Sequence, residues 1–159
     1  MRVNGSQGVK PIECINPPKN KWAVRWDIQP SDESGCDYEE QIFDHKPTLG
    51  EIKDLILGWS NKKTETKIIE GFAWNGIPVW LSIENQVNIQ AAYNLAVQSE
   101  GKNLPTMKLG TSDEPVYHTF QSMEEFADFY TKSLAHVQNV RAEGWKEKDS
   151  FDFDSYENS

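Results

Sequence analysis

The chain has 159 residues and a formal net charge of −9, from 16 Lys and Arg against 25 Asp and Glu. A chain of this length can bury a hydrophobic core without disulfide bridges, so we expect one ordinary domain. Its negative charge opposes nucleic acid and anionic membranes as partners, because both require a surface rich in Lys and Arg.

The first 21 residues predict an extended N-terminal arm, residues 1–21, with no packed element of its own. They contain Pro11, Pro17 and Pro18 and show little hydrophobic periodicity, and such a segment is often ordered only by a partner. Neither this arm nor any other stretch has the apolar run of a signal peptide or of a bilayer-spanning helix. We therefore expect a protein that is made and stays soluble in a cytoplasm, with no membrane partner.

Strand-like alternation begins at Trp22. Trp22, Val24, Trp26 and Ile28 share one face, with the period of two that is typical of a half-buried strand. A polar loop follows, and residues 38–43 have the composition of a returning strand. These features predict an N-terminal hairpin.

Thr48 and Glu51 form a capping box, in which each side chain satisfies a free N–H group at the start of a helix. This helix should end at Gly71. Its first half carries one apolar stripe, but residues 68–69 fall out of phase with it, so we expect a break or bend near residues 60–61. The stripe consists of Leu49, Ile52, Leu55, Ile56 and Trp59.

The Asn-Gly dipeptide at 75–76 predicts a tight hairpin turn, because both residues readily take the positive φ values of a type I′ turn. The resulting register pairs Trp74 with Ile77 and extends the hairpin over residues 72–79. Trp80 then points to the opposite face of the hairpin.

Ser82 can cap a helix from Ile83 to about Ser99, and the composition of this helix is unusual. No charged residue occurs between Asn85 and Ser99, whereas a helix on an ordinary surface carries a charged stripe. Apolar and amide side chains are distributed around the whole helix. We therefore expect a central helix, covered on several sides, whose buried amides need hydrogen-bond partners.

Residues 105–109 and 115–120 flank a polar turn and predict a further hairpin. Ser122 and Glu125 form a second capping box, which begins a long amphipathic helix that Gly144 should end. The expected buried face of this helix consists of Met123, Phe126, Ala127, Tyr130, Leu134 and Val137.

Together these elements predict an α+β fold, in which two or three short hairpins form a small antiparallel sheet packed on three main helices. A single α+β domain should span residues 22–145, between the N-terminal arm and an acidic C-terminal tail, residues 146–159. The tail carries Phe151, Phe153 and Tyr156, and we expect it either to fray or to dock.

The sequence contains no motif for catalysis, for a metal or for a cofactor: it has no His-Glu-x-x-His, no Gly-x-Ser-x-Gly and no phosphate-binding loop. Cys14 and Cys36 lack the spacing of a zinc site, and a disulfide between them is open but not favoured. Glu84 lies beside Trp80 in sequence, yet the helix dipole accounts for a Glu in the first turn, and no second carboxylate is placed near it.

Other candidate ligands also have ordinary explanations. His118 alternates on a strand and His136 lies on the polar face of its helix, so both are expected to be partly exposed residues without a catalytic role. The acidic triplet in the tail lacks the glycine and the terminal glutamate of a calcium loop. It consists of Asp149, Asp152 and Asp154.

The candidate interaction residues are Trp74, Trp80, Asn85, Gln86 and Tyr93. Aromatic side chains serve a core, a protein interface or a sugar-stacking platform equally well. Core packing is favoured for Trp74. For Trp80, a core position, a glycan contact and a contact between subunits remain open.

One run of the sequence resembles a domain of unknown function found in bacteriophage tail and tail-fibre-associated proteins, in particular versions from phages and prophages of Bacteroidales. The similar pattern extends from about Trp26 to Tyr156, and the N-terminal arm lies outside it. The resemblance implies a setting, a phage particle, but no mechanism. The residues that carry it are Gly71-Phe72, Trp74, Val79-Trp80-Leu81-Ser82, Glu84-Asn85-Gln86, Asn88 and Ala91-Ala92, with His45-Lys46-Pro47, Leu104-Pro105, Gly144-Trp145 and Lys148-Asp149.

We therefore expect a non-enzymatic virion structural or adaptor protein of the tail or host-attachment apparatus, made in the cytoplasm of the bacterial host. Its partners would be other phage structural proteins, further copies of itself and, in the alternative, a host glycan. That alternative is a glycan-binding module of a phage adhesin, built on Trp80. An intracellular phage accessory or assembly protein is a further alternative, and an enzyme acting on cell-wall sugars would depend on Glu84.

Overall fold

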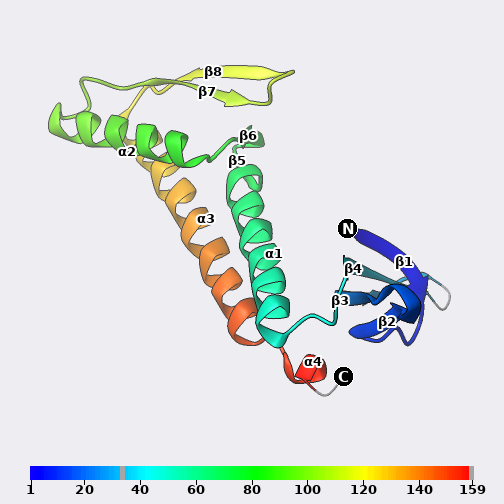
Figure 1. Ribbon diagram of the computed structural model, residues 1–159. Helices are drawn as coiled ribbons and strands as arrows, with labels where there is room; N and C mark the ends of the chain where they lie inside the picture. Colours follow the sequence, from blue (N-terminus) through cyan, green and yellow to red (C-terminus); the bar gives the residue numbers. More distant parts are fainter. Residues whose placement is uncertain (33–34, 158–159) are drawn as a thin grey trace. The chain divides into compact units, whose positions relative to one another are not determined.

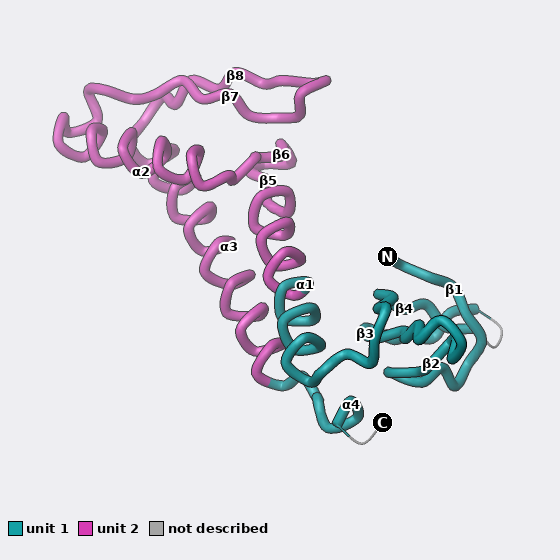
Figure 2. Tube along the Cα trace, in the orientation of Figure 1, with its two compact units in different colours: residues 1–59, 150–159 teal, residues 60–149 magenta. Residues whose placement is uncertain are grey.

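The computed structural model describes residues 1–32 and 35–157. The chain divides into two compact units, the first formed by Met1–Trp59 with Ser150–Ser159 and the second by Ser60–Asp149 (Figure 2). The bounds of these units differ from those of the single domain expected over residues 22–145, which stays a prediction. The described residues combine three main helices with antiparallel strands, so the predicted α+β class is confirmed.

The first unit is built on a four-stranded antiparallel sheet with the strand order β1-β4-β3-β2 (Figure 1). The expected hairpin forms its centre, and Trp22 pairs with Phe43. The strands are β1 (Arg2–Ser6), β2 (Ile12–Asn16), β3 (Lys21–Pro30) and β4 (Gly35–Phe43), with a short 3-10 turn, η1 (Pro17–Lys19), after β2.

The expectation that residues 1–21 form an extended arm without a packed element is wrong. β1 pairs with β4 and β2 pairs with β3, so this segment supplies both edge strands of the sheet. Backbone N–H and C=O groups make these ladders, and they need no hydrophobic alternation in the added strand. Ile12 is the one fully buried side chain of the two strands, which is why the sequence pattern gave no strand prediction here.

The two sides of β3 are both covered. Val24 and Trp26 enter a core with Ile52 and Ile56, as the alternation predicted. The other side is buried as well, because Ala23 and Arg25 are also shielded from solvent.

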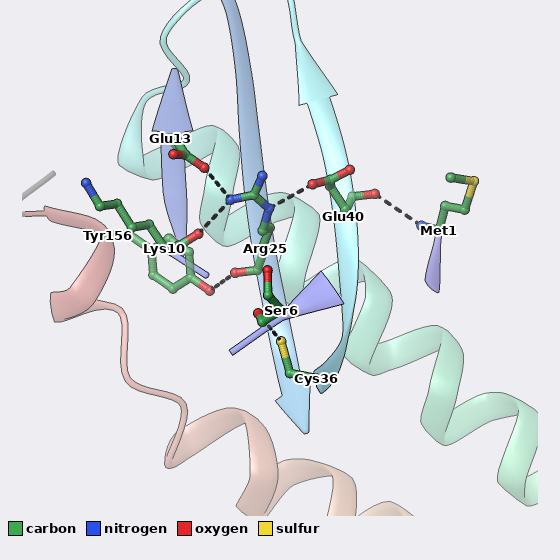
Figure 3. Close-up of polar contacts among 8 residues, drawn as sticks. All are labelled: Met1, Ser6, Lys10, Glu13, Arg25, Cys36, Glu40 and Tyr156. Atoms are coloured by element: carbon green, nitrogen blue, oxygen red, sulfur yellow. Dashed lines mark hydrogen bonds and ion pairs between the residues drawn. The ribbon is translucent and has the colours of Figure 1, made fainter. Parts of the chain in front are cut away.

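The C-terminal tail docks on the first unit. Phe151 and Phe153 pack against its core, and the short helix α4 (Asp154–Glu157) buries Tyr156. The Tyr156 hydroxyl donates a hydrogen bond of 2.6 Å to the carbonyl oxygen of Arg25 (Figure 3). Of the two expected outcomes, docking is therefore the one observed.

Helix α1 (Leu49–Glu70) begins with the predicted capping box, in which Thr48 N–H donates to Glu51 Oε2 and Glu51 N–H donates to Thr48 Oγ1. It ends just before Gly71, as expected. The helix is continuous through residues 60–61, so the predicted break is wrong.

The second unit contains two hairpins and two further helices. The hairpin β5 (Phe72–Trp74) and β6 (Ile77–Val79) has the predicted register, with Trp74 opposite Ile77. The hairpin β7 (Thr106–Gly110) and β8 (Pro115–Thr119) follows helix α2 (Ile83–Gln98), and β7 contacts β6. No helix among the described residues is long and apolar enough to cross a membrane.

Helix α3 (Met123–Asp149) continues past Gly144, which was expected to end it. Gly144 is needed for packing, because an added Cβ would lie 2.3 Å from Thr64 Oγ1. The buried face of α3 is also rotated from the predicted one: Phe129 is fully buried, whereas Leu134 is exposed. The observed face consists of Phe126, Phe129, Ser133, Val137 and Gly144.

Candidate functional site

A groove beside Trp80 is the candidate functional site, and it lies entirely within the second unit. Its volume is about 630 Å³, and a smaller hollow of about 190 Å³ adjoins it and shares Trp80, Asn85 and Lys108 with it. The β5–β6 hairpin, the first turn of α2 and the β7–β8 hairpin provide the lining. The lining residues of the groove are Ile69, Glu70, Pro78, Val79, Trp80, Asn85, Lys108, Leu109, Gly110, Thr111 and Ser112.

The alternation of the β5–β6 hairpin places Trp80 in the groove. Val79 and Leu81 on either side of it are buried in the core, so the Trp80 side chain faces outward and is 53% exposed. A large aromatic side chain with half of its surface in solvent is a strong anchor for a binding partner. The predicted orientation of Trp80 is therefore observed.

Hydrogen bonds hold the segment that carries Trp80. The Asn85 Nδ2 group donates to the carbonyl oxygen of Trp80 at 2.8 Å, and Gln86 Nε2 donates to that of Leu81 at 2.8 Å. Leu81 N–H in turn donates to the carbonyl oxygen of Ile69 at 2.9 Å. The backbone beneath the indole is thus fixed before any partner arrives, which lowers the entropic cost of binding.

Asn85 and Gln86 can reach these carbonyl groups because they occupy the first turn of α2. Ser82 caps this turn, as predicted, and its Oγ atom accepts the N–H group of Asn85 at 3.2 Å. Side chains in a first helical turn lie close to the chain that enters the helix. The two amides expected as interaction residues therefore support the site from within the chain.

The polar character of the groove comes from a few side chains on its rim. Glu70 and Lys108 contribute one charge of each sign, and Thr111 and Ser112 add hydroxyl groups. The rest of the lining is largely apolar. This combination suits a partner with both apolar surface and neutral hydrogen-bonding groups.

Trp74 belongs to the core, as favoured from the sequence. Its side chain is 3% exposed, and its ring contacts those of Phe120 and Phe129. The indole Nε1–H donates to Asp128 Oδ2 at 3.0 Å, and this bond, with a weaker contribution from Lys132, lowers the pKa of Asp128.

Tyr93 packs between two helices. Its ring stacks on Tyr130 of α3 with a centroid distance of 3.9 Å and an interplanar angle of 4°. Half-buried there, Tyr93 lies outside the lining of the groove.

The remaining candidate residues have structural partners. His118 Nε2 lies 2.7 Å from Glu125 Oε1, and the pKa of Glu125 is lowered chiefly by the backbone N–H of Gln121 and then by His118. His136 Nε2 contacts the carbonyl oxygens of Lys67 and Ile68 at the end of α1. These contacts account for both histidines.

The acidic candidates do not form a site with one another. Glu84 is exposed in the first turn of α2 and is absent from the groove lining. Within residues 1–32 and 35–157, no group of three or more His, Cys, Asp or Glu side chains is placed to hold a metal ion. Cys14 and Cys36 are both free, on strands that β3 separates, so the disulfide left open from the sequence does not form.

Sequence patterns gave no sign of an ion-pair network in the first unit, centred on the buried Arg25. Arg25 is 8% exposed; its Nε atom donates to Glu40 Oε2 at 2.7 Å and its NH1 atom to Glu13 Oε2 at 2.8 Å (Figure 3). The hydrogen bond from Arg25 lowers the pKa of Glu13. The partners come from three strands, so no local spacing pointed to them. The arrangement satisfies a buried charge within the sheet.

No protein-family model, no curated protein and no solved structure matches this chain.

Proposed function

We propose that this protein is a non-enzymatic structural or adaptor protein of a bacteriophage particle, in its tail or host-attachment apparatus. The observation that carries the proposal is the exposed indole of Trp80, held over a groove by a hydrogen-bonded backbone. An adaptor needs such a rigid aromatic anchor, because a few aromatic side chains supply most of the binding energy of an interface.

The phage setting rests on the sequence resemblance. Some of the residues that carry this resemblance also build the candidate site. Trp80, Asn85 and Gln86 belong to the run that carries it, and these are also the anchor and the two amides that hold its backbone. Proteins that share this run would share the turn that exposes Trp80, and therefore the same binding surface. This coincidence supports a common mode of attachment.

The composition of the groove favours binding over hydrolysis. Glycoside hydrolysis uses two carboxyl groups at a defined separation, and the groove lining contributes one carboxylate, that of Glu70. Glu84, the acid considered from the sequence, lies outside that lining. The groove lining therefore supports a function in which a partner is bound and released without being chemically changed.

The proposal is tested on purified particles of the phage, or of the induced prophage, that encodes the chain. Mass spectrometry across a density gradient should find the protein in constant ratio to the other virion proteins. Trp80→Ala should reduce incorporation strongly. The matched control is Trp145→Ala, which removes another exposed Trp, from α3. A protein abundant in the infected cell but absent from the particles would overturn the proposal.

A glycan-binding module is the second candidate function, and the surroundings of Trp80 favour it specifically. Asn85, Thr111 and Ser112 are neutral hydrogen-bonding residues that line the same groove as the exposed Trp80, and an aromatic face in such a groove suits a sugar ring. Titration with polysaccharide from the host surface should show saturable binding that Trp80→Ala abolishes and Trp145→Ala retains. Binding that both variants retain would exclude this groove as the glycan site.

A further inference from the structure

The outer face of helix α2 is apolar and unusually exposed. Four large apolar side chains of this helix lie outside the core and are between 52% and 73% exposed: Ile83, Val87, Leu95 and Val97. Residues spaced by four lie in one row along a helix, and Ile83, Val87, Ala91 and Leu95 form such a row here. Only Ile89 and Ala96 of the helix are fully buried. The expectation of a central helix covered on several sides is therefore wrong for the isolated chain.

Neutral amides accompany this row. Gln90, Asn94 and Gln98 are also spaced by four and exposed, next to the apolar row. Within the described part of the chain, none of these three side chains makes a hydrogen bond. Each amide carries both donor and acceptor groups, so a surface of amides is complementary to a copy of itself.

The net charge of the chain indicates which partner binds this face of α2. With a net charge of −9, two copies repel each other, and most surfaces would bring carboxylates together on self-association. The helix surface between Asn85 and Ser99 carries no charge at all. A basic partner would gain nothing from an uncharged face, whereas a second copy that binds there brings no carboxylate of this stretch against another.

We propose that α2 is the contact between two copies of this chain, which pack antiparallel about a two-fold axis near Ala91. The small side chain of Ala91 lets the two helices approach at the axis. Val87 of each copy then lies against Leu95 of the other, because a two-fold interface repeats every contact. The stretch from Val87 through Ala91 to Leu95 is covered by its own symmetry mate, and Ile83 lies at the edge of the contact, opposite Ser99 of the other copy. This proposal holds whether or not the protein belongs to a phage particle.

The size of the face sets the expected affinity. Sixteen residues of helix extend over about 24 Å, so one helix face buries much less than the ~800 Å² per partner of a standard interface. The dimer should therefore dissociate in the micromolar range. A contact of micromolar affinity is fully formed when an assembly holds the two copies side by side, because their effective concentration is then high.

The experiment is sedimentation velocity on the full chain, from about 1 to about 300 µM, where weak dimers of this kind become populated. The expected result is a reversible monomer–dimer equilibrium. Val87→Glu should weaken it about tenfold or more, since it forces a carboxylate against apolar surface. Leu95→Lys should weaken it similarly. Val116→Glu, the same type of change on the exposed strand β8, is the matched control and should leave the equilibrium unchanged.

The double variant Val87→Glu/Leu95→Lys is the decisive sample. In the antiparallel dimer it creates two Glu–Lys pairs, one on each side of the axis, so the dimer should return to within about threefold of the original affinity. Residues 87 and 95 are too far apart on one helix to pair within a chain. A monomer at every concentration, or a double variant weaker than both single ones, overturns the proposal. A monomer whose Val87→Glu variant no longer enters particles would assign the face to another virion protein.

Discussion

Ionisation of Tyr156 should destabilise the first unit at alkaline pH. Its hydroxyl donates to the carbonyl oxygen of Arg25 at 2.6 Å, and its ring is buried against the core. Burial, together with the carboxylate of Asp152, raises the pKa of Tyr156 from 10.0 to about 12. The folded state therefore holds this proton more tightly than the unfolded state does.

The sign and size of the effect follow from that difference in pKa. A raised pKa contributes stability that is fully present below the unfolded pKa and is lost as pH rises from about 10 to about 12. A shift of about two pH units corresponds to roughly 3 kcal/mol of unfolding free energy. That is a large share of the total for a small unit, since domains are stable by only about 5–15 kcal/mol.

Hydrogen exchange of the β3 amides reports on the first unit by itself, and Tyr156→Phe removes the ionising group. At neutral pH the variant should be less stable by about 1 kcal/mol, the typical worth of the lost hydrogen bond. Between pH 10 and 12 it should lose less stability than the original chain. Tyr117→Phe, at an exposed tyrosine, is the matched control. Parallel losses in the original chain and in Tyr156→Phe would refute the argument.

Three further predictions concern individual contacts. Gly144→Ala should destabilise the second unit by about 1–3 kcal/mol in thermal unfolding, because its Cβ would meet Thr64 Oγ1, and adding Thr64→Ala should recover part of the loss. Ser82→Ala should cost about 1 kcal/mol by removing the cap of α2, whereas Ser82→Asp should keep most of the stability in the same assay. The lowered pKa of Glu13 means that its pairing with Arg25 stabilises the first unit above about pH 4.5 and loses this effect as pH falls. Arg25→Met should flatten that acid dependence, which denaturant unfolding at a series of pH values would show.

Local chemistry in the sequence was sufficient for the turn at 75–76 and for the starts of the helices. The 75–76 turn and the Ser82 cap depend on residues within a few positions of one another, and both were predicted correctly. The edge strands β1 and β2 were missed because ladder pairing to β4 and β3 leaves little trace in side-chain composition. Phe129 was missed because a rotation of the buried face by one residue needs knowledge of what α3 packs against.

The candidate site was predictable only in part. Alternation along the β5–β6 hairpin placed Trp80 on the outer side, since each step along a strand reverses the face. The groove itself requires β7 to lie beside β6, a contact between residues that are distant in sequence. The support from Asn85 and Gln86 was visible only as an amide-rich first turn. Such a turn predicts polar contacts but not their targets.

The expected break in α1 shows how one continuous helix can carry a change of phase in its apolar pattern. Ile52, Ile56, Ser60 and Ile68 are all buried, and Thr64 between them is half-buried, so a single row spaced by four residues continues through the expected break. Each step of four residues turns such a row by about 40° around the helix axis. Over sixteen residues the buried side therefore moves to nearly the opposite face, and the later isoleucines fall out of phase with the first stripe. The two polar members of the row, Ser60 and Thr64, hide this continuity in the sequence, because a count of hydrophobic residues skips them although Ser60 is buried and Thr64 is half-buried.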